Sequence, residues 1–379
     1  MRIFKKKKEK IPLTEIMSEN IRYVKELAKY KLKLGDNKVY TRVHDGIVFE
    51  ANTMELIEEM VKFYEQAKLD GNPETTKEFF DGLKKVGTKI SCVNIKRHEI
   101  RDGYHFLGYA PDLNFQDKNM IHLTVNDVVN RNSELLFHEG GHVLDYYSRN
   151  YYNSYLGVKW ATENFAKDAL NNKNNLSDDF INYFSSFQRK YIAFIEKLDN
   201  DLEGPKHKKN IDEITMKKCK QIYGEAVSKT NFELMRERIK YCYRDSIIRN
   251  SGMGPISDIY CALTNGRLTE DPSVEGNEKG NSSFEVKSTI YYGHFNRYFA
   301  FPPVYYNKLL KKEEITDEEV KDSLYRKVAE ILADFSALIN LGKKDLMYEF
   351  FPSDFIEKLQ ETYDQIIMQT REKNMAVAV

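Results

Sequence analysis

The sequence predicts an α+β fold in which helices dominate and one small mixed sheet lies between helical regions. Residues 54–69 carry apolar side chains at three- and four-residue spacing, which is typical of an amphipathic helix. Residues 89–127 instead contain three short segments rich in β-branched and aromatic residues, KISCVNI, YHFLGYA and NMIHLTVND, which turn residues separate. Helical patterns then return and continue almost to the end of the chain.

Composition limits the classes of protein to which this chain can belong. Of its 379 residues, 41% are hydrophobic and 31% are charged, which is enough apolar material for a large core and excludes a wholly disordered chain. The 58 basic and 58 acidic residues cancel, which argues against nucleic acid as a main partner. No segment approaches the ~18 consecutive apolar residues of a membrane span, so no membrane partner is expected.

The N-terminal residues and the cysteines both favour a cytoplasmic location. The basic run at residues 5–8 has no apolar segment behind it and therefore does not resemble a secretory signal; it is interpreted as a solvated end, the alternative being a tether. The four cysteines are far apart and suggest neither a disulfide framework nor a zinc ribbon. The sequence does not indicate an oligomeric state.

The pattern of helix and strand signals suggests two regions. Residues 1–88 are expected to form an N-terminal helical region, with helical character from residue 12 onward. Residues 89–379 would contain the sheet, a helix over 133–150, and closing helices over 316–341 and 352–371. A large helical insertion is expected at about 151–250, with breaks near 171–179 and 203–210. The Gly-, Ser-, Asn- and Glu-rich residues 265–284 are expected to form a loop that could act as a lid.

The strongest motif is His138-Glu139-Gly140-Gly141-His142, an H-E-x-x-H pattern. Positions i and i+4 share one face of a helix, so both imidazoles can bind one metal ion. Glu139 lies about 100° around the helix and can reach a water on that ion. With 8 histidines in 379 residues, such a motif is expected by chance on the order of 0.01 times per chain. Two glycines inside a helix cost about 1 kcal/mol each, which a purely structural helix has little reason to accept.

A third ligand has to come from another part of the chain. Glu330 and Asp334 are spaced by four residues in a segment that is otherwise apolar. An acidic pair in an apolar stripe needs compensation, so Glu330 is a candidate ligand. An exposed pair on an amphipathic helix is the alternative interpretation.

These segments together resemble a known class of enzymes. HEGGHVLDYY (138–147) and AEILADFSALI (329–339) are similar to the two motif helices of the gluzincin metallopeptidases, in particular the family of the anthrax lethal factor catalytic domain. The FFPSDFIEKLQETYDQII segment resembles the closing helix of those domains. ISDIYCALTNGRL and YYGHFNRYF are similar to segments of the metallopeptidase domains of phages and mobile elements.

The resemblance implies a zincin-like catalytic domain over residues 89–379 and a role for each matched residue. His138, His142 and Glu330 would bind Zn²⁺, and Glu139 would act as the general base. Metal-ligating histidines usually need a carboxylate behind them, which Asp334 would supply. Asp145 would do the same for an imidazole or would pair with a nearby arginine instead.

A donor for the oxyanion of the transition state is also required. Tyr292 resembles the tyrosine that precedes the glutamate helix in relatives of lethal factor, and His294 is the neighbouring choice. Either residue could instead serve only in packing.

The sequence thus predicts a zinc-dependent endopeptidase that cleaves a protein or peptide substrate. The substrate would bind along an edge strand formed by YHFLGYAPDLN or NMIHLTV. One alternative is a processing or assembly component of a phage or mobile element that acts on one dedicated partner. Another is a non-catalytic, zinc-containing binding module, which the presence of Glu139 disfavours.

Overall fold

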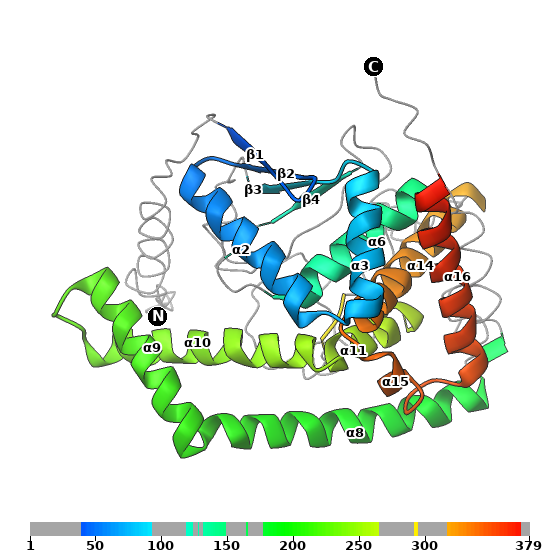
Figure 1. Ribbon diagram of the computed structural model, residues 1–379. Helices are drawn as coiled ribbons and strands as arrows, with labels where there is room; N and C mark the ends of the chain where they lie inside the picture. Colours follow the sequence, from blue (N-terminus) through cyan, green and yellow to red (C-terminus); the bar gives the residue numbers. More distant parts are fainter. Residues whose placement is uncertain are drawn as a thin grey trace, which may run out of the picture.

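The computed structural model describes residues 39–92, 119–123, 128, 132–148, 164–165, 177–264, 292–294 and 317–372. In this part of the chain, a small sheet lies beside a group of buried helices, and three long helices extend along the opposite side (Figure 1). The predicted class, a helix-dominated fold with one small mixed sheet, is confirmed.

The sheet begins with a β-hairpin inside the region that the sequence predicted to be helical. β1 (Tyr40–His44) pairs antiparallel with β2 (Ile47–Ala51). The turn residues Asp45 and Gly46 have φ angles of 50° and 77°, the positive values that a tight hairpin turn requires. The prediction of a helical region from residue 12 to about residue 88 is therefore wrong for residues 40–51. Residues 1–38 lie outside the described part.

Two parallel strands follow in the described part of the sheet. β3 (Lys89–Cys92) pairs with β2, and β4 (Met120–His122) pairs with β3, which gives the order β1-β2-β3-β4. Two of the three predicted strand segments are thus confirmed, and YHFLGYA lies outside the described residues. Because β2 pairs with β3, the sheet extends across the domain boundary that was predicted at residue 88.

Two capped helices connect the hairpin to β3. α2 (Met54–Asp70) begins after Thr53, whose side chain accepts a hydrogen bond from the Leu56 backbone N–H. α3 (Pro73–Lys85) begins with a proline and is capped by Asn72. α2 contacts both strands of the hairpin, and both helices contact α6 (Ser133–Ser148), the helix that carries the H-E-x-x-H motif.

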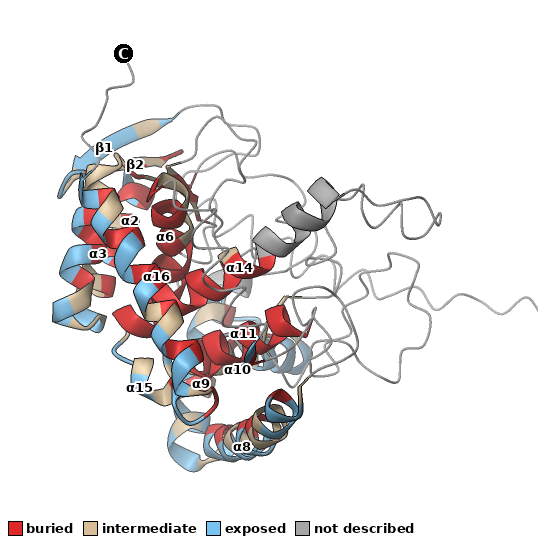
Figure 2. Ribbon diagram, turned by 90° about the vertical axis from the view of Figure 1, so that its right-hand side faces the viewer, coloured by how far each residue is buried: buried red, intermediate tan, exposed pale blue. Residues whose placement is uncertain are grey.

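Three helices with deeply buried faces form the centre of the molecule. α6 packs against α14 (Asp317–Asn340) more extensively than any other pair of described elements pack together, and α11 (Met253–Leu263) lies on the other side of α14. Figure 2 shows that α6, α11 and residues 327–340 of α14 are largely buried. α15 (Lys344–Met347) and α16 (Ser353–Glu372) follow, so the predicted helices over 133–150, 316–341 and 352–371 are confirmed.

The described part of the predicted insertion forms an arm of three helices, α8 (Asp178–Glu203), α9 (Pro205–Tyr223) and α10 (Lys229–Asn250) (Figure 1). The chain turns at Gly204-Pro205, inside one of the two predicted breaks. α10 returns to the centre and leads directly into α11. The predicted loop at 265–284 lies outside the described residues, and among the helices that are described none is long and apolar enough to span a bilayer.

Gly140 allows α6 to lie close to α3. A Cβ atom at this position would lie 2.4 Å from Cζ of Phe79 and 3.2 Å from Cδ1 of Leu83. The Phe79 ring is fully buried and contacts the rings of Phe80 and Phe137, with centroid distances of 5.3 and 5.5 Å. The ring therefore has little room to move away.

We predict that Gly140→Ala lowers the free energy of unfolding, by about 1–3 kcal/mol, because overpacking outweighs the gain of about 1 kcal/mol in helix propensity. Urea unfolding of the metal-free protein measures the change. Phe79→Leu in the same chain should relieve part of the loss, so the double variant should be more stable than the sum of the two single changes predicts. Equal or greater stability of Gly140→Ala alone would contradict this account of the helix contact.

Candidate metal site

The motif histidines lie on one face of α6, as the i and i+4 spacing predicts. Their ring centroids are 4.9 Å apart. His138 is buried and His142 is partly exposed, so the pair lies at the boundary between the core and the surface. Glu139, the next residue along α6 after His138, is also buried.

A second glycine brings α14 against this face of the motif helix. A Cβ atom on Gly141 would lie 2.8 Å from Cβ of Ser336 and 3.2 Å from the backbone Cα of Ala333. Across the same contact, the Ser336 hydroxyl donates a hydrogen bond of 3.1 Å to the carbonyl oxygen of Phe137. Each glycine of the motif therefore has a packing role, and Gly141 allows the close approach of the helix that carries the predicted acidic pair.

Glu330 faces both motif histidines. Its Oε2 lies 3.3 Å from Nε2 of His138, and its Oε1 lies 3.6 Å from Nε2 of His142. Ligand atoms at ~2.0–2.1 Å from a tetrahedral Zn²⁺ would be about 3.4 Å apart, so these separations fit one ion. One ligand atom from each of the three residues lies within 4.8 Å of the others. These buried and partly buried groups can hold a metal ion.

Asp334 lies behind one of the imidazoles. Its Oδ1 is 3.0 Å from Nδ1 of His138, and the carboxylate is fully buried. A hydrogen bond from Nδ1–H to this carboxylate leaves the Nε2 lone pair directed toward the side where Glu330 lies. Asp145, the other residue predicted to orient an imidazole, is buried three positions after His142 on the same helix.

The structure adds an aspartate–histidine pair that the sequence analysis did not assign as a pair. Nδ1 of His294 lies 2.9 Å from Oδ2 of Asp258, and the backbone N–H of His294 donates a 2.9 Å hydrogen bond to Oδ1. The same Nδ1 is 3.8 Å from Oε2 of Glu330. Asp258 comes from the interior of α11 and is only 1% exposed. An acidic residue inside the apolar run ISDIYCAL is the signal that could have identified it, by the argument that identified Glu330.

Tyr292 is held on several sides. Its ring lies against the Arg249 guanidinium, 4.1 Å from ring centroid to Cζ, and its backbone N–H donates a 3.2 Å hydrogen bond to the Tyr191 hydroxyl. The side chains of Ser257 and Cys261 both donate to its carbonyl oxygen. Of the two predicted oxyanion donors, His294 is therefore the one whose side chain lies next to Glu330, while the Tyr292 ring packs on an arginine.

Arg249 connects the helical arm to the motif helix. Its guanidinium donates a 3.0 Å hydrogen bond to Oε2 of Glu134 at the start of α6 and a 2.9 Å hydrogen bond to Asp245. Both Arg249 and Glu134 are almost fully buried. Removing one member would leave an uncompensated buried charge, so this contact fixes α10 against α6.

Charged groups of both signs strongly shift the pKa values of the side chains in this cluster. Burial alone would lower the pKa of His138, but the Asp334 and Glu330 carboxylates outweigh it and raise this pKa well above the usual value. Burial would raise the pKa of Glu330, yet His294, His142 and His138 hold it well below its usual range. Burial and the nearby Asp258 raise the pKa of Asp334. Such mutual perturbation in a buried cluster is typical of functional sites.

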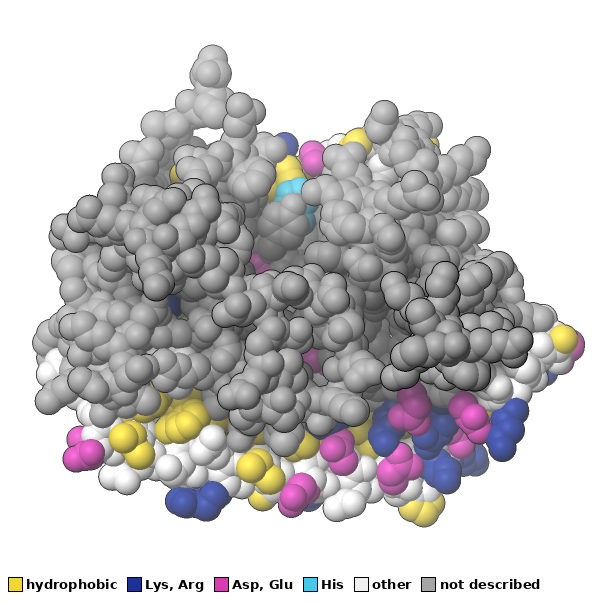
Figure 3. Space-filling model, turned by 180° about the vertical axis from the view of Figure 1, so that it is seen from behind, with side chains coloured by type: hydrophobic (Ala, Val, Ile, Leu, Met, Phe, Trp, Pro, Cys, Tyr) yellow, Lys and Arg dark blue, Asp and Glu magenta, His cyan; other side chains and the backbone are white. Residues whose placement is uncertain are grey.

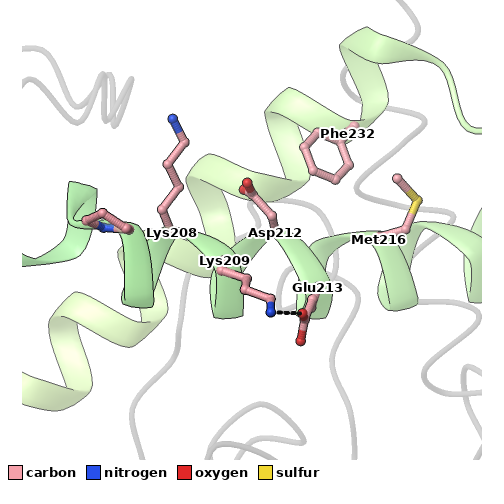
Figure 4. A pocket seen from close by; sticks show the side chains of 7 residues that line it. Lys208, Lys209, Asp212, Glu213, Met216 and Phe232 are labelled. Atoms are coloured by element: carbon pink, nitrogen blue, oxygen red, sulfur yellow. Dashed lines mark ion pairs between the residues drawn. The ribbon is translucent and has the colours of Figure 1, made fainter.

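A groove on the arm is a poorer candidate for chemistry. Figure 4 shows it between α9 and α10, with the ion pair of Lys209 and Glu213 on one wall and Met216 and Phe232 at the other end. It is open and lies away from the cluster of histidines and carboxylates. On the face that Figure 3 shows, the described side chains along the bottom of the molecule are an intermixed set of positive, negative and apolar groups, with no concentration of one charge.

The chain has no match among models of protein families, among curated proteins or among solved structures. The candidate site therefore rests on its own residues and their geometry.

We predict that Asp334→Asn weakens zinc binding about 10- to 100-fold, because the neutral amide no longer stabilises the His138 Nδ1–H as a carboxylate does. Competition with a chromophoric zinc chelator measures the affinity. Ser336→Ala is a matched control, since it removes a buried hydrogen bond between the same two helices without touching an imidazole. An unchanged zinc affinity in Asp334→Asn would show that this carboxylate does not support the metal site.

Proposed function

We propose that this chain is a zinc-dependent endopeptidase of the gluzincin type. The observation that carries the proposal is the convergence of Glu330, from a helix far along the chain, on the two histidines of the H-E-x-x-H motif. Two imidazoles and one carboxylate leave a coordination position open, which is the donor set of hydrolytic zinc sites. Glu139, placed directly after His138 on α6, supplies the carboxylate that such chemistry needs as a base.

Each residue of the site has a separate role in peptide hydrolysis. When bound, Zn²⁺ supplies a Lewis acid that polarises the peptide carbonyl and acidifies a water molecule. Glu139 accepts the proton of the attacking water and then delivers it to the leaving amine. Asp334 keeps the His138 ring in the orientation and tautomer that present Nε2 to the ion.

The substrate is proposed to be an extended peptide that adds to the edge of the sheet. β4 contacts α6 and is the last strand in the described order, so a peptide added at this edge would lie beside a strand that the motif helix contacts. Backbone hydrogen bonds along an edge strand bind a peptide largely independently of its side chains. β4 belongs to the NMIHLTV segment, one of the two edges proposed from the sequence.

Zinc content and peptide cleavage, measured together, test this function. We expect the wild type to bind zinc tightly at His138, His142 and Glu330 and to cleave members of a diverse peptide library. Glu330→Ala should lose zinc and activity, whereas Glu139→Ala should keep zinc and lose activity by several orders of magnitude, because only the base is removed. Glu349→Ala, which removes an exposed carboxylate paired with Lys190, is the control for substitution of an acidic residue.

Three results would contradict parts of the proposal. A wild-type protein that binds no zinc would exclude the metal site. Zinc binding without cleavage of any peptide would exclude a general endopeptidase and favour an enzyme with one dedicated protein substrate. Full activity of Glu139→Ala would exclude Glu139 as the base.

A further inference from the structure

We propose that Asp258 and His294 form, together with Glu330, a second divalent-cation site beside the zinc site, with the Glu330 carboxylate shared between the two ions. This inference rests on the proposed function because it uses Glu330 as a ligand of both sites. It assigns a role to Asp258 and a different role to His294 from the oxyanion donor expected from the sequence.

The geometry of the three side chains fits one ion. Asp258, His294 and Glu330 come from three separate elements, yet one ligand atom of each lies within 4.8 Å of the others. Nδ1 of His294 is 2.9 Å from Oδ2 of Asp258 and 3.8 Å from Oε2 of Glu330. Neighbouring ligand atoms around an ion with bonds of ~2.1 Å are about 3.0–3.4 Å apart. The separation of His294 and Asp258 is already close to this range, and that of His294 and Glu330 would shorten by a few tenths of an ångström.

The Glu330 carboxylate lies between the two groups of ligands. Its Oε1 faces His142, and its Oε2 faces His138 on one side and His294 on the other. In hydrolytic sites that contain two metals, the ions lie about 3.5–4 Å apart. A carboxylate with imidazoles on both sides is placed to bridge two ions at that spacing.

The balance of charge favours a second cation. Glu330, Asp334 and Asp258 are all at most 3% exposed, and Glu139 is also buried nearby on α6. Cations that lie among buried carboxylates offset their negative charge. The buried Arg249 is already paired with Glu134 and Asp245. A divalent ion held by Asp258, His294 and Glu330 would lower the negative charge of this part of the core.

The segment that carries His294 is fixed before any ion binds. Gly293 has a φ of 146°, and a Cβ atom there would lie 2.3 Å from Sγ of Cys261 and 2.9 Å from Oδ1 of Asp258. Tyr292, directly before it, is held by contacts from α8, α10 and α11. A preorganised set of donors is what a metal site requires, and only glycine allows this close approach.

The donor set indicates the kind of ion and its use. Two carboxylates and one imidazole suit Mn²⁺ or Zn²⁺, which accept mixed oxygen and nitrogen ligands. A second ion next to the first would stabilise the negative charge that develops on the substrate carbonyl oxygen. It would thus serve where the sequence analysis expected Tyr292 or His294 to donate a hydrogen bond.

Metal stoichiometry of the full chain tests the second site. Chelated protein is dialysed against Zn²⁺ alone or Mn²⁺ alone, and metal per chain is measured by mass spectrometry. We expect two ions per chain in the wild type and one in Asp258→Asn and in His294→Ala. Ser257→Ala is the control, because it removes a contact to the Tyr292 carbonyl without removing a ligand. With Mn²⁺, the wild type should give the electron paramagnetic resonance spectrum of a coupled pair, and each ligand variant that of an isolated ion.

The possible outcomes separate this inference from the proposed function. Saturation of the wild type at one ion would overturn the second site and leave Asp258 and His294 as a hydrogen-bonded pair beside a single zinc. Two ions that survive both ligand substitutions would also overturn it. A wild type that binds no ion would refute the proposed function as well. If Asp258→Asn fails to fold, the partly exposed His294 decides the question through His294→Ala.

Discussion

The close approach of α6 and α14 is the contact on which the rest of the site depends. Gly141 has no side chain to separate the helices, so the backbone of Ala333 and the side chain of Ser336 lie directly against it. Glu330 is one turn before this contact on α14, and Asp334 immediately follows Ala333. The same contact therefore brings one carboxylate to Nε2 of His138 and another to Nδ1. Any larger residue at position 141 would move both carboxylates together.

Contacts from α8 and α10 connect the site to the helical arm. α10 leads into α11, and Arg249 at the end of α10 pairs with Glu134 at the start of the motif helix. The Tyr191 hydroxyl, from α8, accepts a hydrogen bond from the backbone of Tyr292. The arm is thus more than an insertion that the fold tolerates, because its helices position Asp258 and His294. Breaking the buried Arg249 contact would leave a charge without compensation and would disturb the site from a distance.

Local patterns in the sequence predict much of this arrangement, but they do not predict its long-range contacts. The H-E-x-x-H spacing placed His138 and His142 on one helix face, and the acidic pair in an apolar stripe identified Glu330 and Asp334. An Asp-Gly pair such as Asp45-Gly46 is a hairpin signal in a sequence, although a helix was expected here. The pairing of Asp258 with His294 joins α11 to a separate segment, and no spacing rule predicts which buried carboxylate an imidazole will meet.

The sequence also does not show why the motif helix contains Gly140 and Gly141. Their cost in helix propensity suggested a special role, but only the packing shows that Gly140 receives the Phe79 ring and Gly141 receives α14. A glycine in a helix can make room for a bound ligand, for a neighbouring helix or for a bend. The sequence shows the same residue in all three cases and does not distinguish them. Here both glycines serve helix packing, and one of those contacts brings together the residues of the candidate metal site.

The proposed function requires an ion bound between α6 and α14. Diffraction from zinc-loaded crystals, recorded on both sides of the zinc absorption edge, locates such an ion without reference to activity. A zinc ion bound by these helices should give an anomalous peak at ~2.0–2.1 Å from Nε2 of His138, Nε2 of His142 and a carboxylate oxygen of Glu330. A zinc-loaded crystal with no peak among these three residues, or with zinc bound only at another place, would contradict it.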